Sequence, residues 1–209
     1  MSDFERKIRA LLQQPLPGSR GQIKMSPRPV NESRFQFKQR PNAREGAVLI
    51  LFYPDQGEFY LPLIKRPSYE GAHGGQVSLP GGKLEEGDEN LIDTALREAE
   101  EEIGIDRSQV EVLGQMSQLY IPASDFVVLP VVGIMSEKPN FKPDSYEVAR
   151  ILLTPFERLL DPNYRKEKRM TISHQYQIDS PFYDIEEEVV WGATAMILSE
   201  LVTAWEEFE

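Results

Sequence analysis

Three glutamates and one arginine are the residues of this chain most clearly suited to chemistry. At about 100° per residue, Arg97, Glu98, Glu101 and Glu102 fall within an arc of roughly 140° of one helix. Like charges at these spacings repel one another and destabilise an isolated helix by a few tenths of a kcal/mol per pair. A divalent cation would remove this repulsion, because carboxylate oxygens are its preferred ligands. The opposite side of the same helix is apolar: Ile92, Ala95, Leu96, Ala99 and Ile103.

An acidic run on a helix is most often a solvated surface, and this interpretation has to be weighed against a metal site. The residues on both sides of the helix favour the metal site. A glycine-containing turn precedes it, and a glycine follows it at the position of a C-terminal cap, Gly104. The preceding turn comprises Leu79, Pro80, Gly81, Gly82 and Lys83.

The stretch from Gly82 to Ile105 resembles the Nudix box. That pattern is Gly, five residues, Glu, seven residues, then Arg-Glu-apolar-any-Glu-Glu-any-Gly-apolar. Residues 97–105 fill its second half without a mismatch, whereas the first half contains one additional residue. Asp88 stands at the family distance after Gly82, and Glu89 stands at the family distance before Arg97. Either of them could be the upstream acid.

The segment before the box resembles that of the coenzyme A pyrophosphatases, a branch that tolerates the additional residue. Glu70 and Gly71 stand where this branch usually has a Leu-Arg pair. The stretch from Trp191 to Ala195 is also similar to the branch. The matching residues before the box are Arg66, His73, Gly75, Gln76, Val77, Ser78, Pro80, Gly81 and Gly82.

The resemblance implies that Glu98 and Glu102 are the principal metal ligands. It implies that Glu101 is either a third ligand or the group that activates water. Arg97 would orient a glutamate through a two-pronged pair, which is compatible with a plain salt bridge to Glu101. These four residues are the predicted catalytic set, and the three glutamates are the predicted metal set.

The predicted substrate-binding residues are Arg66, His73, Gln76, Gly81, Gly82 and Lys83. Arg66 and Lys83 are the nearest cations for substrate phosphates, while His73 could bind phosphate, transfer a proton or hold the glycine loop. Glu147 could be a general base, but an exposed surface acid is the favoured interpretation. The basic residues Arg165, Lys166, Lys168 and Arg169 could meet a distal phosphate, but a solvated loop is the favoured interpretation, and His174 receives no role.

The composition narrows the metal chemistry. The 209-residue chain has no cysteine and only two histidines. These counts exclude a disulfide framework, a thiolate zinc site, a cysteine nucleophile and a multi-histidine metal site. A metal must therefore bind mainly oxygen ligands, which indicates Mg²⁺ or Mn²⁺. The net charge of −11 argues against a general nucleic-acid binder.

Hydrophobic periodicity predicts the elements that must hold these residues. The strands 47–53 and 59–64 form a hairpin around a turn at 54–57, and Gly104 ends the helix at 91–103. Residues 1–43 contribute a helix at 3–13 and an extended arm with a strand or two, as part of the same unit as the domain at 44–209. The other predicted elements are strands at 110–119, 126–135 and 146–153, helices at 155–160 and 193–205, and a basic loop at 165–169.

The resemblance implies an α/β (α+β type) fold, an α/β/α sandwich with a mixed β-sheet. The implied reaction is hydrolysis of coenzyme A or its acyl derivatives to 4′-phosphopantetheine, or its acyl form, and adenosine 3′,5′-bisphosphate. Hydrolysis of ADP-ribose, NADH or a dinucleotide is the alternative, and a catalytically idle binding module is a third. We expect a cytoplasmic location and a small-molecule partner, neither nucleic acid nor membrane, and leave a homodimer open.

Overall fold

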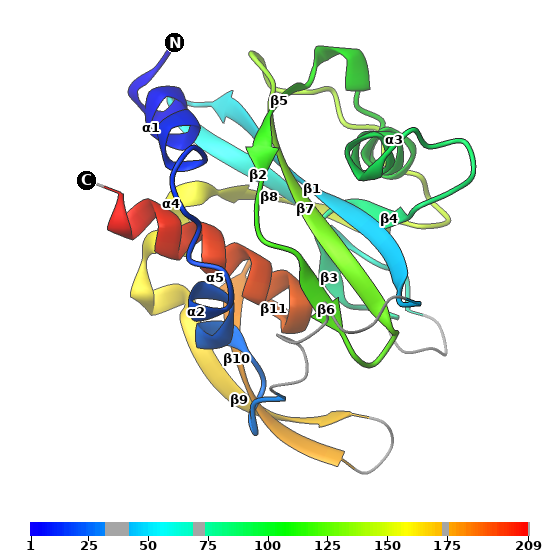
Figure 1. The fold of residues 1–209 in the computed structure, drawn as a ribbon, viewed down its shortest axis with the longest axis vertical. Helices are drawn as coiled ribbons and strands as arrows, with labels where there is room; N and C mark the ends of the chain where they lie inside the picture. Colours follow the sequence, from blue (N-terminus) through cyan, green and yellow to red (C-terminus); the bar gives the residue numbers. More distant parts are fainter. Residues whose placement is uncertain (32–41, 69–73, 173–175, 209) are drawn as a thin grey trace.

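A mixed eight-stranded sheet forms the centre of the computed structural model, which describes residues 1–31, 42–68, 74–172 and 176–208 (Figure 1). The strands β1 and β7 run parallel, and all other pairs in this sheet are antiparallel. The main path is β3 (Val77–Ser78), β2 (Glu58–Lys65), β1 (Arg44–Asp55), β7 (Phe126–Ile134) and β5 (Glu111–Gln115). Three strands pair beside this path: β4 (Gly81–Lys83) with β1, β6 (Leu119–Ile121) with β7, and β8 (Arg150–Pro155) with β2.

The central strand β1 explains why both faces of the sheet are covered. Its side chains alternate between two cores, because successive residues of a strand point to opposite faces. Leu49 and Leu51 pack in the core that includes α3 (Leu91–Ile103). Ile50 and Phe52 pack in the core that includes α5 (Gly192–Glu207). A run that is apolar at every position is therefore the pattern of a strand buried on both sides.

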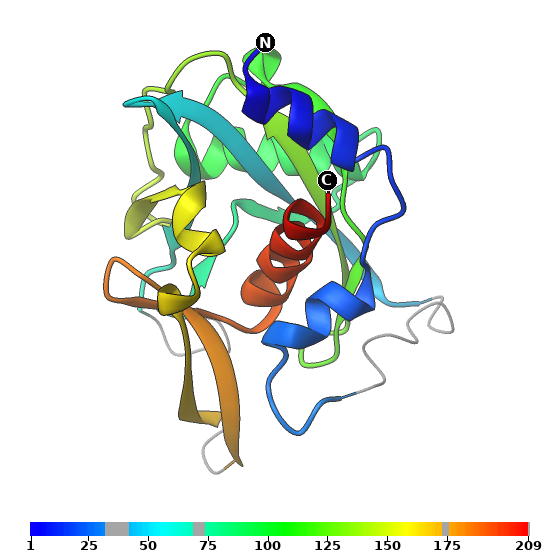
Figure 2. The same ribbon diagram turned by 90° about the vertical axis from the view of Figure 1, so that its left-hand side faces the viewer.

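Helices flank the sheet on both faces, as the predicted sandwich requires (Figure 2). The helix α3 covers one face, and α1 (Asp3–Leu11) and α5 lie on the other. An aromatic cluster joins the first and last helices: the Phe4 ring lies 4.1 Å from Phe59 and 5.0 Å from Trp205, between ring centroids. The short helix α4 (Phe156–Leu160) contributes Phe156 to the same cluster. The fold class is thus confirmed. Among the described residues, no helix is both long and apolar enough to cross a membrane.

Part of the segment after α1 is helical, so the extended arm predicted there is wrong for residues 19–25. It forms α2 (Ser19–Gln22) and the 3₁₀ helix η1 (Ile23–Met25). The physical reason is a buried anchor on α5: the Glu200 carboxylate accepts hydrogen bonds from Gly18 N (3.0 Å) and Gln22 Nε2 (3.0 Å). Residues 32–41 lie outside the described part of the chain.

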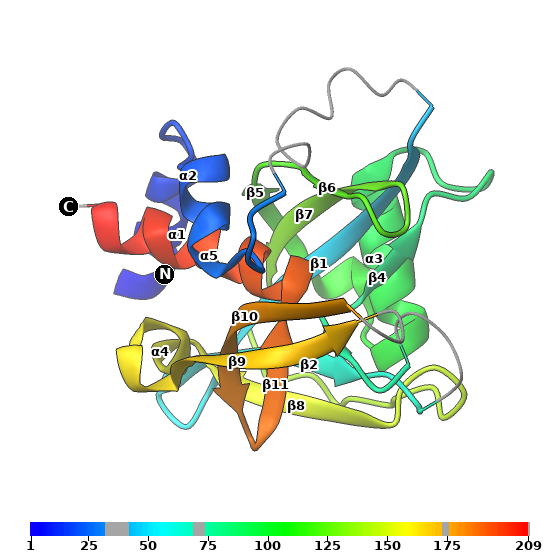
Figure 3. The ribbon, with the colours of Figure 1, turned by 90° about the horizontal axis from the view of Figure 1, so that it is seen from below.

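The basic stretch predicted as a loop is a strand. A second, three-stranded antiparallel sheet contains β9 (Arg165–Ile172), β10 (Tyr176–Ile185) and β11 (Glu188–Trp191), in the order β11-β10-β9 (Figure 3). Cross-strand charge pairs explain why so polar a segment is extended. Arg169 lies directly opposite Asp179 and pairs with it at 2.9 Å, and Lys166 pairs with Asp184.

The helix that carries the acidic face has a clear start and end. The Asn90 side chain accepts hydrogen bonds from the backbone at Ile92 and Asp93, which caps the N-terminus. Gly104 has φ 67° and ψ 30°, the left-handed conformation of a C-terminal cap, as predicted. The predicted strand at 146–153 is shifted: β8 begins only at Arg150, because the chain turns over the end of α3 before it.

Candidate functional site

Two adjacent glycines let α3 lie directly against the edge strand β4. Gly81 and Gly82 pair with Val48 and Ala47 of β1. Gly81 has φ 149°, and a Cβ there would collide with the backbone of β1. A Cβ on Gly82 would collide with the carboxylate of Glu98. The absence of side chains at both positions therefore creates the space in which acids from α3 meet the strand backbone.

Glu102 is the most deeply buried acid of the predicted set, with a side chain 1% exposed. Its carboxylate accepts a hydrogen bond from the Gly81 backbone N–H at 2.8 Å and lies 3.5 Å from a guanidinium nitrogen of Arg66. Burial raises the pKa of Glu102 to about 7, and the charges of Glu98 and Glu147 act in the same direction. The site thus holds a carboxylate whose negative charge is poorly compensated by the protein.

Glu98 lies one helical turn earlier, with its carboxylate against Gly82. Burial raises the pKa of Glu98 as well, opposed by a hydrogen bond from Arg97 at 3.0 Å. The charge of Glu98 raises the pKa of Glu102, and the charge of Glu147 raises the pKa of both. The structure therefore brings these two predicted ligands together beside Gly81 and Gly82.

Arg97 organises the acids around it. Its Nε and Nη2 donate to the two oxygens of Asp88 at 2.7 and 2.9 Å, and its Nη1 donates to Glu98 and Glu101 at 3.0 Å each. Arg97 also donates to the Lys83 carbonyl at 3.2 Å, which ties the helix to β4. The two-pronged pair of Arg97 is thus with Asp88 rather than with a glutamate, and Glu98 and Glu101 each accept a single hydrogen bond from it; the role of Arg97 in orienting a glutamate stays a prediction.

The additional residue in the box is accommodated so that Asp88, not Glu89, reaches Arg97. The Asp88 side chain is 1% exposed, and its Oδ2 also accepts from the Thr94 hydroxyl at 2.8 Å and the Glu85 N–H at 3.0 Å. The Arg97 guanidinium lowers the pKa of Asp88 far below its usual range. Glu89 is exposed, and its backbone N–H donates to Asp93. Of the two acids that the sequence left open, Asp88 is the one that contacts Arg97, and its role as the upstream acid of the box stays a prediction.

Two further acids differ in position from the buried pair. The Glu101 side chain is 59% exposed, and its carboxylate faces Arg97. Glu147 is also exposed, as predicted, but its charge raises the pKa of both Glu98 and Glu102. Its loop crosses the C-terminus of α3, where the Asp144 N–H donates to the Glu102 carbonyl at 3.0 Å. Sequence reasoning could not place Glu147 near the acidic pair, because this loop is brought to the helix end only by tertiary structure.

The predicted substrate-binding residues border the same site, with one outside the described residues. Arg66 contacts Glu102, and its backbone N–H donates to the Gln76 carbonyl at 2.9 Å. Lys83 is exposed on β4 beside the two glycines. His73 lies outside the described residues, as do Glu70, Gly71 and His174.

Comparison with models of known protein families shows to which family the chain belongs. The model of the NUDIX domain matches residues 43–175, well over half of the chain. The chain belongs to the Nudix hydrolase family. The matched segment of this Nudix protein includes β1, β4 and the whole of α3.

Curated relatives extend the match over most of the chain. "Nudix hydrolase 15, mitochondrial" of Arabidopsis thaliana is 37% identical over 81% of this chain and 60% of its own length. The chain thus spans about three fifths of that plant relative. The Nudix hydrolase NudL of Yersinia enterocolitica is 36% identical over 86% of this chain and 94% of its own length. Among solved structures, the MutT protein of Methanosarcina mazei Go1 has a TM-score of 0.50 at 19% identity, covering 78% of this chain and 95% of that one, and supports the fold alone.

Nudix hydrolases generally need divalent cations, and the residues at this site fit one. Glu98 and Glu102 supply carboxylate oxygens, the ligands that divalent cations prefer. Their negative charges are buried and close together, and few positive charges of the protein offset them. Within the described residues, however, no three or more Asp, Glu or His side chains form a group that could hold a metal. Glu101 faces Arg97 instead. Of the three predicted metal ligands, only Glu98 and Glu102 therefore have surroundings that favour a cation in this conformation.

Proposed function

We propose that this Nudix hydrolase cleaves a diphosphate linkage with the help of Mg²⁺ or Mn²⁺. The single observation that carries the proposal is the buried pair Glu98 and Glu102, held beside Gly81 and Gly82 by Arg97. A solvated acidic face, the alternative interpretation of the sequence, would not bury a carboxylate to 1% exposure.

The reaction is hydrolysis of a phosphorus–oxygen bond. Oxygen from water bonds to one phosphorus, the bridging oxygen leaves with its electron pair on the other phosphate, and a base accepts the proton from water. A bound divalent ion would neutralise the diphosphate and lower the pKa of the water. Glu98 and Glu102 would hold this ion, and Glu101 would serve as a third ligand or as the base. Glu147, whose charge acts on the buried pair, is a second candidate base.

The proposed substrate is coenzyme A or acyl-coenzyme A. Support comes from the similarity of residues 66–82 to the coenzyme A branch and from the accommodation of the additional box residue, with Asp88 on Arg97. ADP-ribose and NADH remain the alternative substrates. A catalytically idle binding module is disfavoured, because such a module has no need of a repulsive carboxylate pair.

Product analysis separates these substrates. We expect coenzyme A to have a higher kcat/KM than ADP-ribose or NADH in the presence of Mg²⁺ or Mn²⁺, and dephospho-coenzyme A to be poorer than coenzyme A. A preference for ADP-ribose would overturn the coenzyme A assignment and leave the general diphosphate hydrolase. Absence of turnover on every diphosphate would favour the idle module.

The same substrates also test which phosphate of coenzyme A Arg66 contacts. Because it lies 3.5 Å from Glu102, we expect it to meet the diphosphate rather than the 3′-phosphate of coenzyme A. Arg66→Ala should then lower kcat/KM for coenzyme A and dephospho-coenzyme A by similar factors. A loss of about 1–3 kcal/mol confined to coenzyme A would instead assign Arg66 to the 3′-phosphate.

We also propose a cytoplasmic location, although the Arabidopsis relative is named as mitochondrial. Fractionation of cells that express the protein from its own gene tests this, and recovery in an organelle or a membrane fraction would contradict it.

A further inference from the structure

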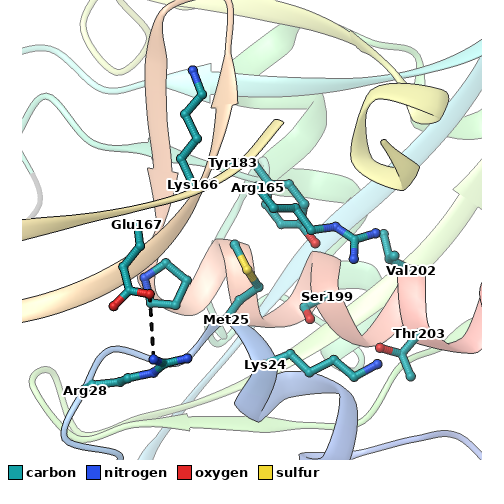
Figure 4. A pocket seen from close by; sticks show the side chains of 11 residues that line it. Lys24, Met25, Arg28, Arg165, Lys166, Glu167, Tyr183, Ser199, Val202 and Thr203 are labelled. Carbon is teal, nitrogen blue, oxygen red and sulfur yellow. Dashed lines mark ion pairs between the residues drawn. The ribbon is translucent and has the colours of Figure 1, made fainter. Parts of the chain in front are cut away.

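A polar cavity lies between the N-terminal segment, the second sheet and α5 (Figure 4). Its volume is about 320 Å³. Its walls come from η1, β9, β10 and α5. Tyr183, Met25 and Val202 belong to the core on the α5 face of the central sheet, whereas the acids of α3 stand on the opposite face. The cavity is therefore separate from the proposed catalytic site.

The lining of this cavity is predominantly basic. Four cations and a single acid line it: Lys24, Arg28, Arg165 and Lys166, with Glu167. This excess is notable in a chain whose net charge is −11, because the surface as a whole repels anions. Anion binding here would have to depend on local groups.

Three of the four cations pair with acids, and two of these three, Arg28 and Lys166, are not part of the proposed anion site. Arg28 pairs with Glu167 at 3.7 Å, and Lys166 pairs with Asp184. Figure 4 shows the Lys166 side chain directed away from α5. Lys24, in contrast, forms no ion pair in the part of the chain that the structure describes.

Arg165 is held in place with donor capacity to spare. One Nη donates to the carbonyls of Leu159 and Leu160, at 3.2 Å each, and to Glu206 at 2.8 Å. Its buried Nε has no hydrogen-bond partner among the described residues but is out of reach of a ligand, so the donor left for an anion is the second Nη, which forms none of these bonds. A guanidinium whose position is fixed by backbone carbonyls loses little conformational freedom when it binds an anion.

Hydroxyl groups complete the lining on α5 and β10. Ser199, Thr203 and Tyr183 all border the cavity. In Figure 4 the Lys24 side chain extends toward Thr203, while Arg165 approaches from the strand side. Hydroxyls and two cations around a compact space suit a tetrahedral, doubly charged oxyanion better than a flat carboxylate.

We propose that this cavity is a second ligand site that binds the phosphate group of a small phosphate monoester, with Lys24 and Arg165 as its cations and Thr203 as a hydroxyl donor. The volume is at the lower end for small-molecule pockets, which fits a phosphate with a short organic group rather than a dinucleotide. The site is independent of diphosphate hydrolysis and would connect the N-terminal segment, through Lys24, to α5.

Calorimetric titration with inorganic phosphate tests the site. The protein is kept free of divalent ions by a chelator, and sodium chloride holds the ionic strength constant. Saturable binding is expected, and Lys24→Gln should weaken it about 10-fold, the lower range for a charged hydrogen bond. Thr203→Val, which keeps the side-chain shape, should weaken it roughly 3-fold or more.

Two control variants locate the bound phosphate. Lys138→Gln removes a charge from an exposed lysine that pairs with Asp55, away from the cavity, and should leave the affinity unchanged. Arg66→Ala should also leave it unchanged, because Arg66 belongs to the acidic site. Unsaturable binding, equal affinity in the wild type and Lys24→Gln, or loss of binding in Arg66→Ala would each overturn the proposal.

Discussion

Asp88 and Arg97 are joined by two parallel hydrogen bonds, with Nε to Oδ1 at 2.7 Å and Nη2 to Oδ2 at 2.9 Å. This pair fixes the guanidinium that in turn holds Glu98 and Glu101. Planar two-pronged pairs impose geometry as well as attraction, so the loop residue Asp88 sets the orientation of acids on the helix.

Asp88→Asn should therefore impair both stability and turnover. We expect the free energy of unfolding to fall by about 3 kcal/mol, the lower end for breaking a buried pair, because Arg97 retains two other acids. Denaturant unfolding and steady-state kinetics measure the two effects. The neighbouring exposed acid provides the control: Glu89→Gln should change stability by less than about 0.5 kcal/mol. If the two variants exchanged these phenotypes, Glu89 would be the upstream acid.

Removal of one charge from the buried acidic pair should abolish turnover without unfolding the protein. Glu102→Gln and Glu98→Gln are expected to lower kcat by several orders of magnitude, because the proposed metal would lose a ligand. Chelation of divalent ions should abolish activity reversibly, with an unchanged far-UV circular dichroism spectrum. Near-normal kcat of either variant at saturating Mg²⁺ would refute its assignment as a ligand.

The end of the box helix should not tolerate a branched side chain. Gly104 has φ 67°, and a Cβ there would lie 2.6 Å from the Lys142 carbonyl oxygen. Gly104→Val should destabilise by about 1 kcal/mol or more and lower the melting temperature. Gly57, also at positive φ but with open space around it, is a matched control, since Gly57→Val keeps the strain and omits the collision. A smaller loss of stability in Gly104→Val than in Gly57→Val would contradict a close contact at this helix cap.

Glu200 should make stability depend on pH. It is fully buried, and burial raises its pKa above the usual value, against hydrogen bonds from Ser117, Gln22 and Gly18. Between the usual and the raised pKa the unfolded chain releases the proton while the folded protein keeps it. The free energy of unfolding must therefore fall as pH rises through that window, and then level off.

Glu200→Gln isolates this effect. The difference in unfolding free energy between the wild type and the variant should change with pH in that window, above about 4.5, the usual value. Above the window, the variant is expected to lose about 1–3 kcal/mol, because the Gln22 amide then faces another amide donor. A pH-independent difference in denaturant titrations would show that Glu200 does not titrate there.

The helix that carries the site could be predicted to the residue. Gly104 is a strong end signal, and the apolar stripe before it has helical spacing; the cap at Asn90 was seen only in the structure. The same local reasoning could not choose between Asp88 and Glu89, because that choice depends on the path of the loop in space. The position of Glu147 near the acidic pair could not be predicted for a similar reason, since it comes from a loop that crosses the helix end.

The second sheet shows where local patterns stop being informative. The stretch that begins at Arg165 has charges on both faces and no apolar alternation, so it resembles a loop. Its strand conformation depends on Asp179 and Asp184, acids on the following strand, as cross-strand partners. The helices α2 and η1 likewise depend on Glu200, which is nearly two hundred residues away in sequence.

The ring of Phe4 on that of Trp205 joins segments from opposite ends of the chain. Because the two rings are about two hundred residues apart in sequence, this contact closes one of the longest loops in the chain and carries a high closure entropy. Trp205 is one of only two tryptophans, and the other, Trp191, stands at the opposite end of the same helix. The fluorescence emission of Trp205 should accordingly differ between a chain in which α1 packs against α5 and one in which only the sheet has formed. Refolding experiments can therefore follow the packing of α1 through this tryptophan.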